Sequence, residues 1–195
     1  MRPQNVPVTM AVIAICVIVF AIDYLQGGAL TNAGAVTPAL VKGGEWWLLI
    51  TGGFLHASVP HILFNMLALF QAGTFVEFAY GSPRYALIYV AGLIAGNLAV
   101  TVLSPAPAIG ASGAIMGVFG AMVVLGFKLP AMRGPLLRAA GFPILLTLAN
   151  GFINPYISWQ AHVGGLLGGA LVAQVLTPAR ASLFQPAAVV PEDEV

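Results

Sequence analysis

Six apolar stretches, each near the length of a membrane-spanning helix, account for most of this 195-residue sequence. A helix that crosses a bilayer needs about 20 predominantly apolar residues. Only 7% of the residues are charged, whereas soluble domains carry about 25%. The sequence therefore predicts an all-α membrane protein with a single domain over residues 1–195. The predicted spans cover residues 7–25, 59–80, 83–103, 112–127, 135–153 and 159–176, and the tail at 179–195 is predicted to be disordered.

The first apolar stretch and the connection after it carry further information. The stretch lacks a small-residue cleavage site and is followed by more spans, so we expect a retained helix rather than a removed signal peptide. The connection at 27–57 contains Trp46 and Trp47, a pair suited to the membrane interface. Cys16 is the only cysteine, which excludes an intramolecular disulfide. The net charge of +1 argues against nucleic acid or another polyanion as a partner.

The basic residues predict the orientation of the spans. With a cytoplasmic N-terminus, six of the seven lie inside and only Lys42 lies outside, as the positive-inside rule requires. The six are Arg2, Arg84, Lys128, Arg133, Arg138 and Arg180. Both termini are then cytoplasmic, and the second, fourth and sixth spans run inward. This orientation brings His61, Ser112 and His162 near the outer ends of their helices.

The turn Gly110-Ala111-Ser112-Gly113 is the one place where a potential nucleophile begins an apolar helix in a tight small-residue turn. Ser112 has two interpretations. Its hydroxyl can cap the helix by accepting from an unpaired backbone amide, or it can act as a nucleophile beside a general base. The fourth span is short, so we expect its start to lie below the membrane surface, reached by the irregular segment 105–111.

His162, at the start of the last span, is the candidate base for Ser112. Proton transfer requires the two side chains to approach within about 2.6 to 3.2 Å. Gly165 and Gly169 belong to one of two overlapping GxxxG patterns in the last span, and Gly113 begins a row of glycines in the fourth. Small residues spaced by four let membrane helices pack closely. We infer that this packing sets the distance from serine to histidine.

His61 and Asn65 stand four residues apart, hence on one face of the second span. Polar residues in a span are costly enough to indicate function, although an interhelical hydrogen bond is an alternative for Asn65. Together with the backbone amide of Ser112, where the helix dipole favours negative charge, the two side chains can form an oxyanion hole. We interpret His56 as a residue that orders the loop before this span.

Taken together, these motifs resemble the rhomboid intramembrane serine proteases. The resemblance runs from Gly44-Glu45-Trp46-Trp47 to Ala161-His162 and the glycines that follow, and so covers nearly the whole chain. It implies the bacterial six-helix core with a membrane-embedded first loop. It also implies a Ser112/His162 dyad, oxyanion contacts from His61 and Asn65, and an active-site turn and helix packing that use Gly110, Gly113, Gly165 and Gly169.

The resemblance further implies what the protein acts on and where. Its substrates are transmembrane segments of other membrane proteins, which reach the site sideways from the lipid bilayer past a mobile fifth span. The expected location is a bacterial plasma membrane. Neither a cofactor nor a metal is expected, and no oligomeric state is predicted.

Two positions depart from the pattern of the family. Leu48 stands where the family usually has Arg after the paired tryptophans, so the order of the first loop can differ. Met116 stands four residues after the serine, where an aromatic residue commonly supports the histidine. A thioether can also pack against a ring, so the dyad remains the preferred interpretation.

Other functions fit the sequence less well. A metalloprotease would need HExxH, which is absent, and an aspartyl protease would need two intramembrane Asp residues, whereas only Asp23 borders a span. A transporter would need ionisable residues near the midplane. The main alternative is a non-catalytic relative that binds or escorts transmembrane helices. The presence of both Ser112 and His162 favours the protease. No carboxylate is clearly positioned to orient His162, so a dyad is preferred over a triad.

Overall fold

A computed structural model describes residues 5–184, and the described chain is helical throughout its predicted spans. The all-α prediction is confirmed. The single β-contact in this part of the chain is an isolated bridge between Val36 and Ala108. The helices that fill the six apolar stretches are α1 (Pro7–Leu25), α5 (Val59–Ala68) with α6 (Thr74–Tyr80), α7 (Ser82–Leu103), α8 (Ser112–Lys128), α9 (Arg133–Ile153) and α10 (Trp159–Val175).

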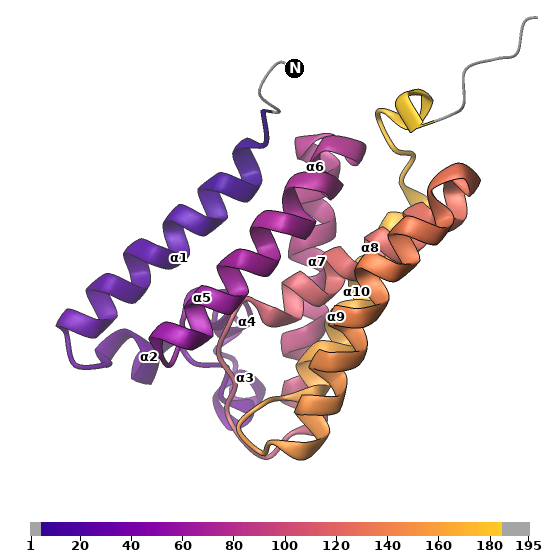
Figure 1. Cartoon of the computed structure of the whole chain (residues 1–195). Helices are drawn as coiled ribbons and strands as arrows, with labels where there is room; N and C mark the ends of the chain where they lie inside the picture. The colour runs from indigo at the N-terminus through magenta and orange to yellow at the C-terminus, as the bar shows by residue number, and fades with distance from the viewer. Residues whose placement is uncertain (1–4, 185–195) are drawn as a thin grey trace, which may run out of the picture.

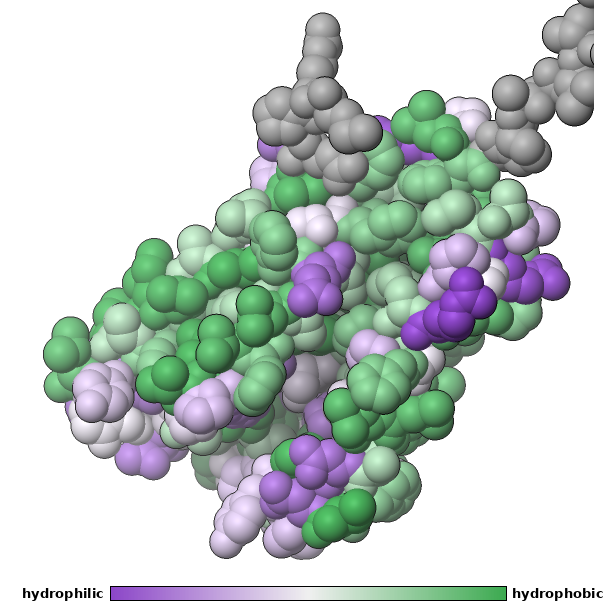
Figure 2. Space-filling model, viewed as in Figure 1, coloured by the Kyte–Doolittle hydropathy of each residue, from purple (hydrophilic) through white to green (hydrophobic). Residues whose placement is uncertain are grey.

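Within residues 5–184, four helical segments are long and apolar enough to cross a membrane. They are Pro7–Leu25, Val59–Tyr80, Ser82–Leu103 and Pro130–Ile153. The helix Ser112–Lys128 is apolar but shorter. Figure 2 shows that apolar side chains cover most of the outward face over α1, as expected for a surface that contacts lipid rather than water. The chain is thus built as a multi-pass membrane protein.

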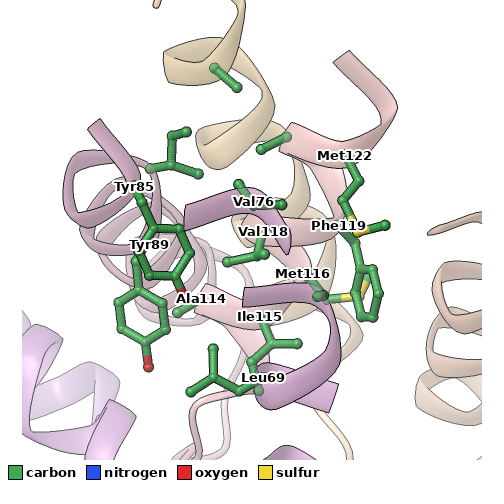
Figure 3. Packing of buried hydrophobic residues seen from close by; sticks show 14 of the residues in the cluster. Leu69, Val76, Tyr85, Tyr89, Ala114, Ile115, Met116, Val118, Phe119 and Met122 are labelled. Carbon is green, nitrogen blue, oxygen red and sulfur yellow. The ribbon is translucent and has the colours of Figure 1, made fainter. Parts of the chain in front are cut away.

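The centre of the bundle is formed by α7, α8 and α10, which make the most extensive contacts in the structure. Most of the α8 residues are buried. Figure 3 shows Ile115 and Val118 of α8 among Leu69 and Val76 of the second span, with Tyr85 of α7 close by. The packing fixes α8 on nearly all sides. By contrast, α1 and α9 lie at the periphery (Figure 1).

The second span is not a uniform α-helix, because Leu69–Gly73 adopts a π-helical turn between α5 and α6. Four residues later, Glu77 is fully buried. Its carboxylate accepts from the backbone amides of Val8 and Thr9 at 3.0 and 2.8 Å, and from the Ser82 hydroxyl at 2.7 Å. The first amides of a helix have no partner within it, so Glu77 takes the place of the missing side-chain cap of α1 and ties α1 to the second span.

The first loop folds into short helices: α2 (Ala29–Gly34), α3 (Pro38–Lys42), α4 (Leu48–Thr51) and the 3-10 turn η1 (Gly52–Phe54). Asp23, at the end of α1, accepts from the Leu30 and Thr31 amides and from the Thr31 hydroxyl. Leu48 is fully buried in an apolar cluster that includes Val36 and Ala161. The residue that departs from the family pattern therefore orders the loop by apolar packing.

The chain beyond α10 returns to the second span. The Arg180 amide donates to the Ala79 carbonyl at 3.1 Å, and its guanidinium lies over the Phe78 ring at 4.7 Å. Residues 181–184 form the 3-10 turn η4 (Ala181–Phe184), whose Phe184 packs against Phe75. Residues 179–184 of the predicted disordered tail are thus held against α6, and the rest of that tail, 185–195, lies outside the described residues.

Candidate active site

Ser112 is the first residue of α8, and the capping position before it is occupied by Ala111. No side-chain hydrogen bond caps this helix. The interpretation of Ser112 as a helix cap is therefore wrong, and its hydroxyl is left to another partner. Gly110, two residues earlier, has φ +120°, a backbone conformation that other residues rarely adopt. The sharp turn at this glycine presents the serine at the start of the helix.

The segment before Ser112 is held by the first loop. Val36 and Ala108 exchange backbone hydrogen bonds of 2.9 and 3.1 Å, and the Gly110 amide donates to the Gly52 carbonyl at 2.8 Å. In Figure 1 this segment rises from the loop end of the molecule toward its middle before α8 begins. These bonds satisfy backbone groups that could not stay unpaired away from water.

The structure brings Ser112 and His162 together although they lie 50 residues apart in the sequence. The Nε2 atom of His162 lies 3.0 Å from the Ser112 hydroxyl oxygen, within hydrogen-bond distance. His162 is only 4% exposed, and its Nδ1 atom has no partner among the described residues. If Nε2 accepts the serine proton, the imidazole must carry its own proton on Nδ1. The arrangement is a serine–histidine pair without an orienting carboxylate in the part of the chain described.

The glycines of α10 face two different helices. A Cβ added at Gly165 would overlap the backbone oxygen of Gly113, and one added at Gly169 would overlap that of Gly117. This pair therefore packs backbone to backbone on α8. Gly164, in the second GxxxG pattern, instead faces α7, where an added Cβ would lie 2.7 Å from the Ala95 carbonyl oxygen. Close approach of α8 and α10 is what allows the short side chains of serine and histidine to meet.

His61 lies directly beside the serine turn. A Cβ added at Gly110 would fall 2.8 Å from His61 Nε2, so the imidazole occupies the space that a side chain at position 110 would need. The other ring nitrogen, Nδ1, accepts from the Ala57 amide at 3.4 Å. Gly110 is thus required both by its φ angle and by the approach of His61.

Asn65 is 7% exposed, and its side-chain amide donates to the His61 carbonyl at 2.9 Å. This bond lies within α5, so the interhelical hydrogen bond weighed as the alternative for Asn65 is absent from the bonds of the described chain. The amide nitrogen carries two hydrogens, and one remains for another acceptor. The bond to His61 holds the side chain in place on the face that it shares with His61.

His56 packs edge-on against the His61 ring, with centroids 5.0 Å apart. Burial, and to a lesser degree the neighbouring His61, lowers the pKa of His56 to about 4. Within the described chain neither ring nitrogen has a hydrogen-bond partner. His56 is therefore neutral near pH 7 and acts as a packing support for His61, in line with the predicted loop-ordering role.

Met116 is 1% exposed and lies in the main apolar cluster beside Phe119 (Figure 3). Two buried carboxylates of the described chain bond to other groups and not to His162: Asp23 accepts from the amides at the start of α2, and Glu77 accepts from those at the start of α1. Glu77 was not singled out from the sequence. The cost of a carboxylate within an apolar span was the signal that could have found it.

A groove of about 380 Å³ separates the second span from α9. Its lining comes from three elements, and the residues are Phe64, Leu67, Ala68, Gln71, Ala72, Phe119, Met122, Ala139 and Pro143. Figure 2 shows the same face of the molecule hollowed between α5 and α9. The groove thus lies between the second span and α9 and is closed on one side by Phe119 and Met122 of α8.

The fold and the site define a helical membrane protein with a serine–histidine pair buried between two tightly packed helices. Residues 43–179 match the rhomboid domain family. The chain is 38% identical over 185 residues to the rhomboid protease GluP of Bacillus subtilis (strain 168), covering 90% of this chain and 36% of GluP. It therefore belongs to the rhomboid family.

Two further relatives extend the comparison. YdcA of the same bacterium is 36% identical over 140 residues, which cover 68% of each protein. The mitochondrial RHOMBOID-like protein 6 of Arabidopsis thaliana is 33% identical over 141 residues, covering 70% of this chain and 46% of that protein. The chain thus spans between about a third and two thirds of the length of these relatives.

Proposed function

We propose that this protein is an intramembrane serine endopeptidase that cleaves transmembrane segments of other membrane proteins near the outer leaflet. The single observation that carries the proposal is the 3.0 Å approach of His162 Nε2 to the Ser112 hydroxyl at the start of a buried helix. Membership of the rhomboid family supports the same conclusion. The absence of this pairing would have favoured a binder of transmembrane helices.

The contact between Ser112 and His162 supports the following sequence of proton transfers. Ser112 Oγ attacks the scissile carbonyl carbon, and its proton passes to His162 Nε2. His162 then donates this proton to the departing amine, so the peptide bond breaks and an acyl ester on Ser112 remains. A water molecule attacks the ester as His162 takes one of its protons, and His162 returns that proton to Ser112 Oγ as the second product leaves with a new carboxyl group. Charge on the carbonyl oxygen is stabilised by the Ser112 amide and by His61 and Asn65.

The proposal includes six membrane spans within a single domain, with both termini in the cytoplasm of a bacterium. The helices α8 and α10, with 17 residues each, complete the six. The first loop is proposed to lie within the outer leaflet, consistent with its exposed Trp46 and Trp47 side chains. Substrates reach Ser112 through the groove between the second span and α9. An intact helix hides its carbonyls, so the substrate must unwind locally before attack.

Cleavage of a single-span reporter of known orientation in liposomes tests the proposal. We expect the wild type to cut the outer part of the span, and Ser112→Ala and His162→Ala to be inactive while remaining folded. Mass spectrometry of the products locates the cut. Turnover by purified Ser112→Ala, or a cut at the cytoplasmic end, would contradict the mechanism or the topology.

A further inference from the structure

The far ends of the two helices that carry the serine and the histidine are joined by a single cation. Lys128 is the last residue of α8, and its ammonium donates to the carbonyls of Ala173, Gln174 and Leu176 at 2.9, 2.7 and 2.6 Å. An ammonium has three donors and no acceptor. All three are thus used on the last turn of α10.

This contact has a clear physical basis. The last carbonyls of a helix have no partner within it, and a cation near them is favoured by the helix dipole. Tyr80 of α6 adds a weaker bond from its hydroxyl to the Ala173 carbonyl, at 3.3 Å. The end of α10 is therefore held by α8 and α6 together. The sequence predicts only that Lys128 is a basic residue on the cytoplasmic side. In the structure it is half-buried and also joins the ends of α8 and α10.

Between the Lys128 contact and the dyad, the surfaces of α8 and α10 that face each other carry few side chains. Between the dyad and Lys128, α8 and α10 meet through Gly113, Gly117, Gly165 and Gly169. Glycines allow close approach, but they provide no side-chain ridges that interlock along the axis. Such an interface resists separation more than it resists sliding. Packing of both helices on α7 and contacts at the ends of α8 and α10 must then contribute to their axial register.

We propose that Lys128 is a positioning residue that sets the axial register of α10 against α8 and so aligns His162 with Ser112. Lys128 follows Ser112 by 16 residues (128 minus 112), about 24 Å along an α-helix. A slide of about 1 Å along the axis would change both the length and the angle of the 3.0 Å approach of His162 to Ser112. Misplacement by this amount can cost about 100-fold in rate. The inference rests on the proposed serine–histidine dyad.

The test compares Lys128→Met, which keeps an apolar stem of similar length, with Lys128→Arg, which restores a cation. Arg133→Met is the matched control, because it removes a basic group of the same connection that lies over the Phe127 ring and donates to no α10 carbonyl among the described bonds. The measurements are the rate of Ser112 labelling by a fluorophosphonate, kcat and KM for a transmembrane reporter, and the thermal stability of each variant.

We expect Lys128→Met to lower both the labelling rate and kcat by about 10-fold to 100-fold per folded molecule, with KM little changed. Lys128→Arg should recover most of this loss, and Arg133→Met should match the wild type. A Lys128→Met protein that melts earlier but labels at the wild-type rate would overturn the inference and leave Lys128 a purely structural residue.

If Lys128→Met does not fold, Lys128→Gln replaces it. The expected order of labelling rates is then wild type, Arg, Gln, and equal rates overturn the inference. Ser112→Ala separates the two proposals. Activity in Ser112→Ala refutes the proposed function, whereas inactive Ser112→Ala together with normal Lys128→Met refutes only the positioning role.

Discussion

The consecutive helices α9 and α10 are both largely apolar, but they differ in how much of each helix is buried. The buried residues of α10 form one continuous face, Ala161, His162, Gly165, Gly169 and Ala173. In α9 only Leu136, Ala140 and Gly151 are buried, near its two ends, and the helix contains Pro143. The middle of α9 exposes Phe142 and Leu145 at about seven tenths of their surface.

This difference separates two requirements of a protease within a membrane. The proposed dyad must keep its geometry, and α10 meets this need by backbone contact with α8. The substrate must also reach that pair from the lipid, and a helix with few buried contacts can move at little cost. We infer that α10 belongs to the rigid part of the site and that α9 borders the path of the substrate.

The largest expected effect comes from the same substitution in each helix. Gly165→Ala would drive a Cβ into the Gly113 backbone, whereas a Cβ at Gly141 of α9 meets no atom within 4 Å. We expect Gly165→Ala to lose activity and at least about 2 kcal/mol of stability. Gly141→Ala should keep both. Thermal unfolding measures the stability and reporter cleavage measures the activity. If Gly165→Ala and Gly141→Ala kept stability and activity equally well, α10 and α9 would not differ in how tightly they are packed.

The next effect concerns His61 and Asn65 of α5, the proposed oxyanion donors. Removing one such donor typically lowers kcat about 10²-fold to 10³-fold. We expect Asn65→Ala and His61→Ala each to fall in or below this range with KM little changed, and the double variant to be slower than either. Single-turnover cleavage is the measurement. Normal rates in the double variant would exclude both residues from the site.

A smaller effect is expected at the groove beside α9. Ala139→Phe places a large side chain on the α9 wall of this groove. Cleavage of a transmembrane reporter should slow several-fold, because the substrate must pass the groove, while the labelling of Ser112 by a small fluorophosphonate should stay unchanged. A parallel fall in both rates would mean that α9 helps to build the dyad rather than border the path.

The smallest effect is a change of stability with pH in the loop that supports His61. The pKa of His56 is lowered by burial from 6.5 to about 4. Between these values the unfolded chain binds more protons at His56 than the folded chain does. The free energy of unfolding is therefore highest above pH 6.5 and decreases as the pH falls toward 4. The slope is at most about 1.4 kcal/mol per pH unit.

His56→Phe provides the control for this slope, because it keeps an aromatic ring that does not titrate. Unfolding should be measured from pH 4 to 8 for both proteins. We expect the wild type to lose stability below pH 6.5 more steeply than the variant. Parallel curves would show that His56 is not the group that titrates.

Much of the fold could be predicted because the signals were local. Apolar length and the glycine and proline residues at the ends fixed α1, α7 and α8 to within one or two residues. The start of α5 also carries a local signal, because Ser58 is a residue type that favours the capping position and its hydroxyl accepts from the His61 amide at 3.3 Å. The π-helical turn at 69–73 could not be predicted, because a run of apolar residues indicates a span but does not distinguish an α-helical turn from a π-helical one.

The candidate site was predictable for a different reason. Ser112 and His162 are polar residues in apolar surroundings, and few alternatives exist in a chain with so little charge. The roles of Glu77 and Lys128 were not predictable, since each depends on which helix end lies nearby. The division of the α10 glycines between α7 and α8 also required the three-dimensional arrangement.

The reactivity of Ser112 tests the central claim most directly. Wild type, Ser112→Ala, His162→Ala and Gly141→Ala are treated with a fluorophosphonate in detergent, and the modified residue is identified by mass spectrometry. We predict stoichiometric modification of Ser112 in the wild type and in Gly141→Ala, none in Ser112→Ala, and a large loss in His162→Ala with the protein still folded. An unmodified Ser112 in folded wild type, or unchanged labelling of His162→Ala, would contradict a serine activated by this histidine.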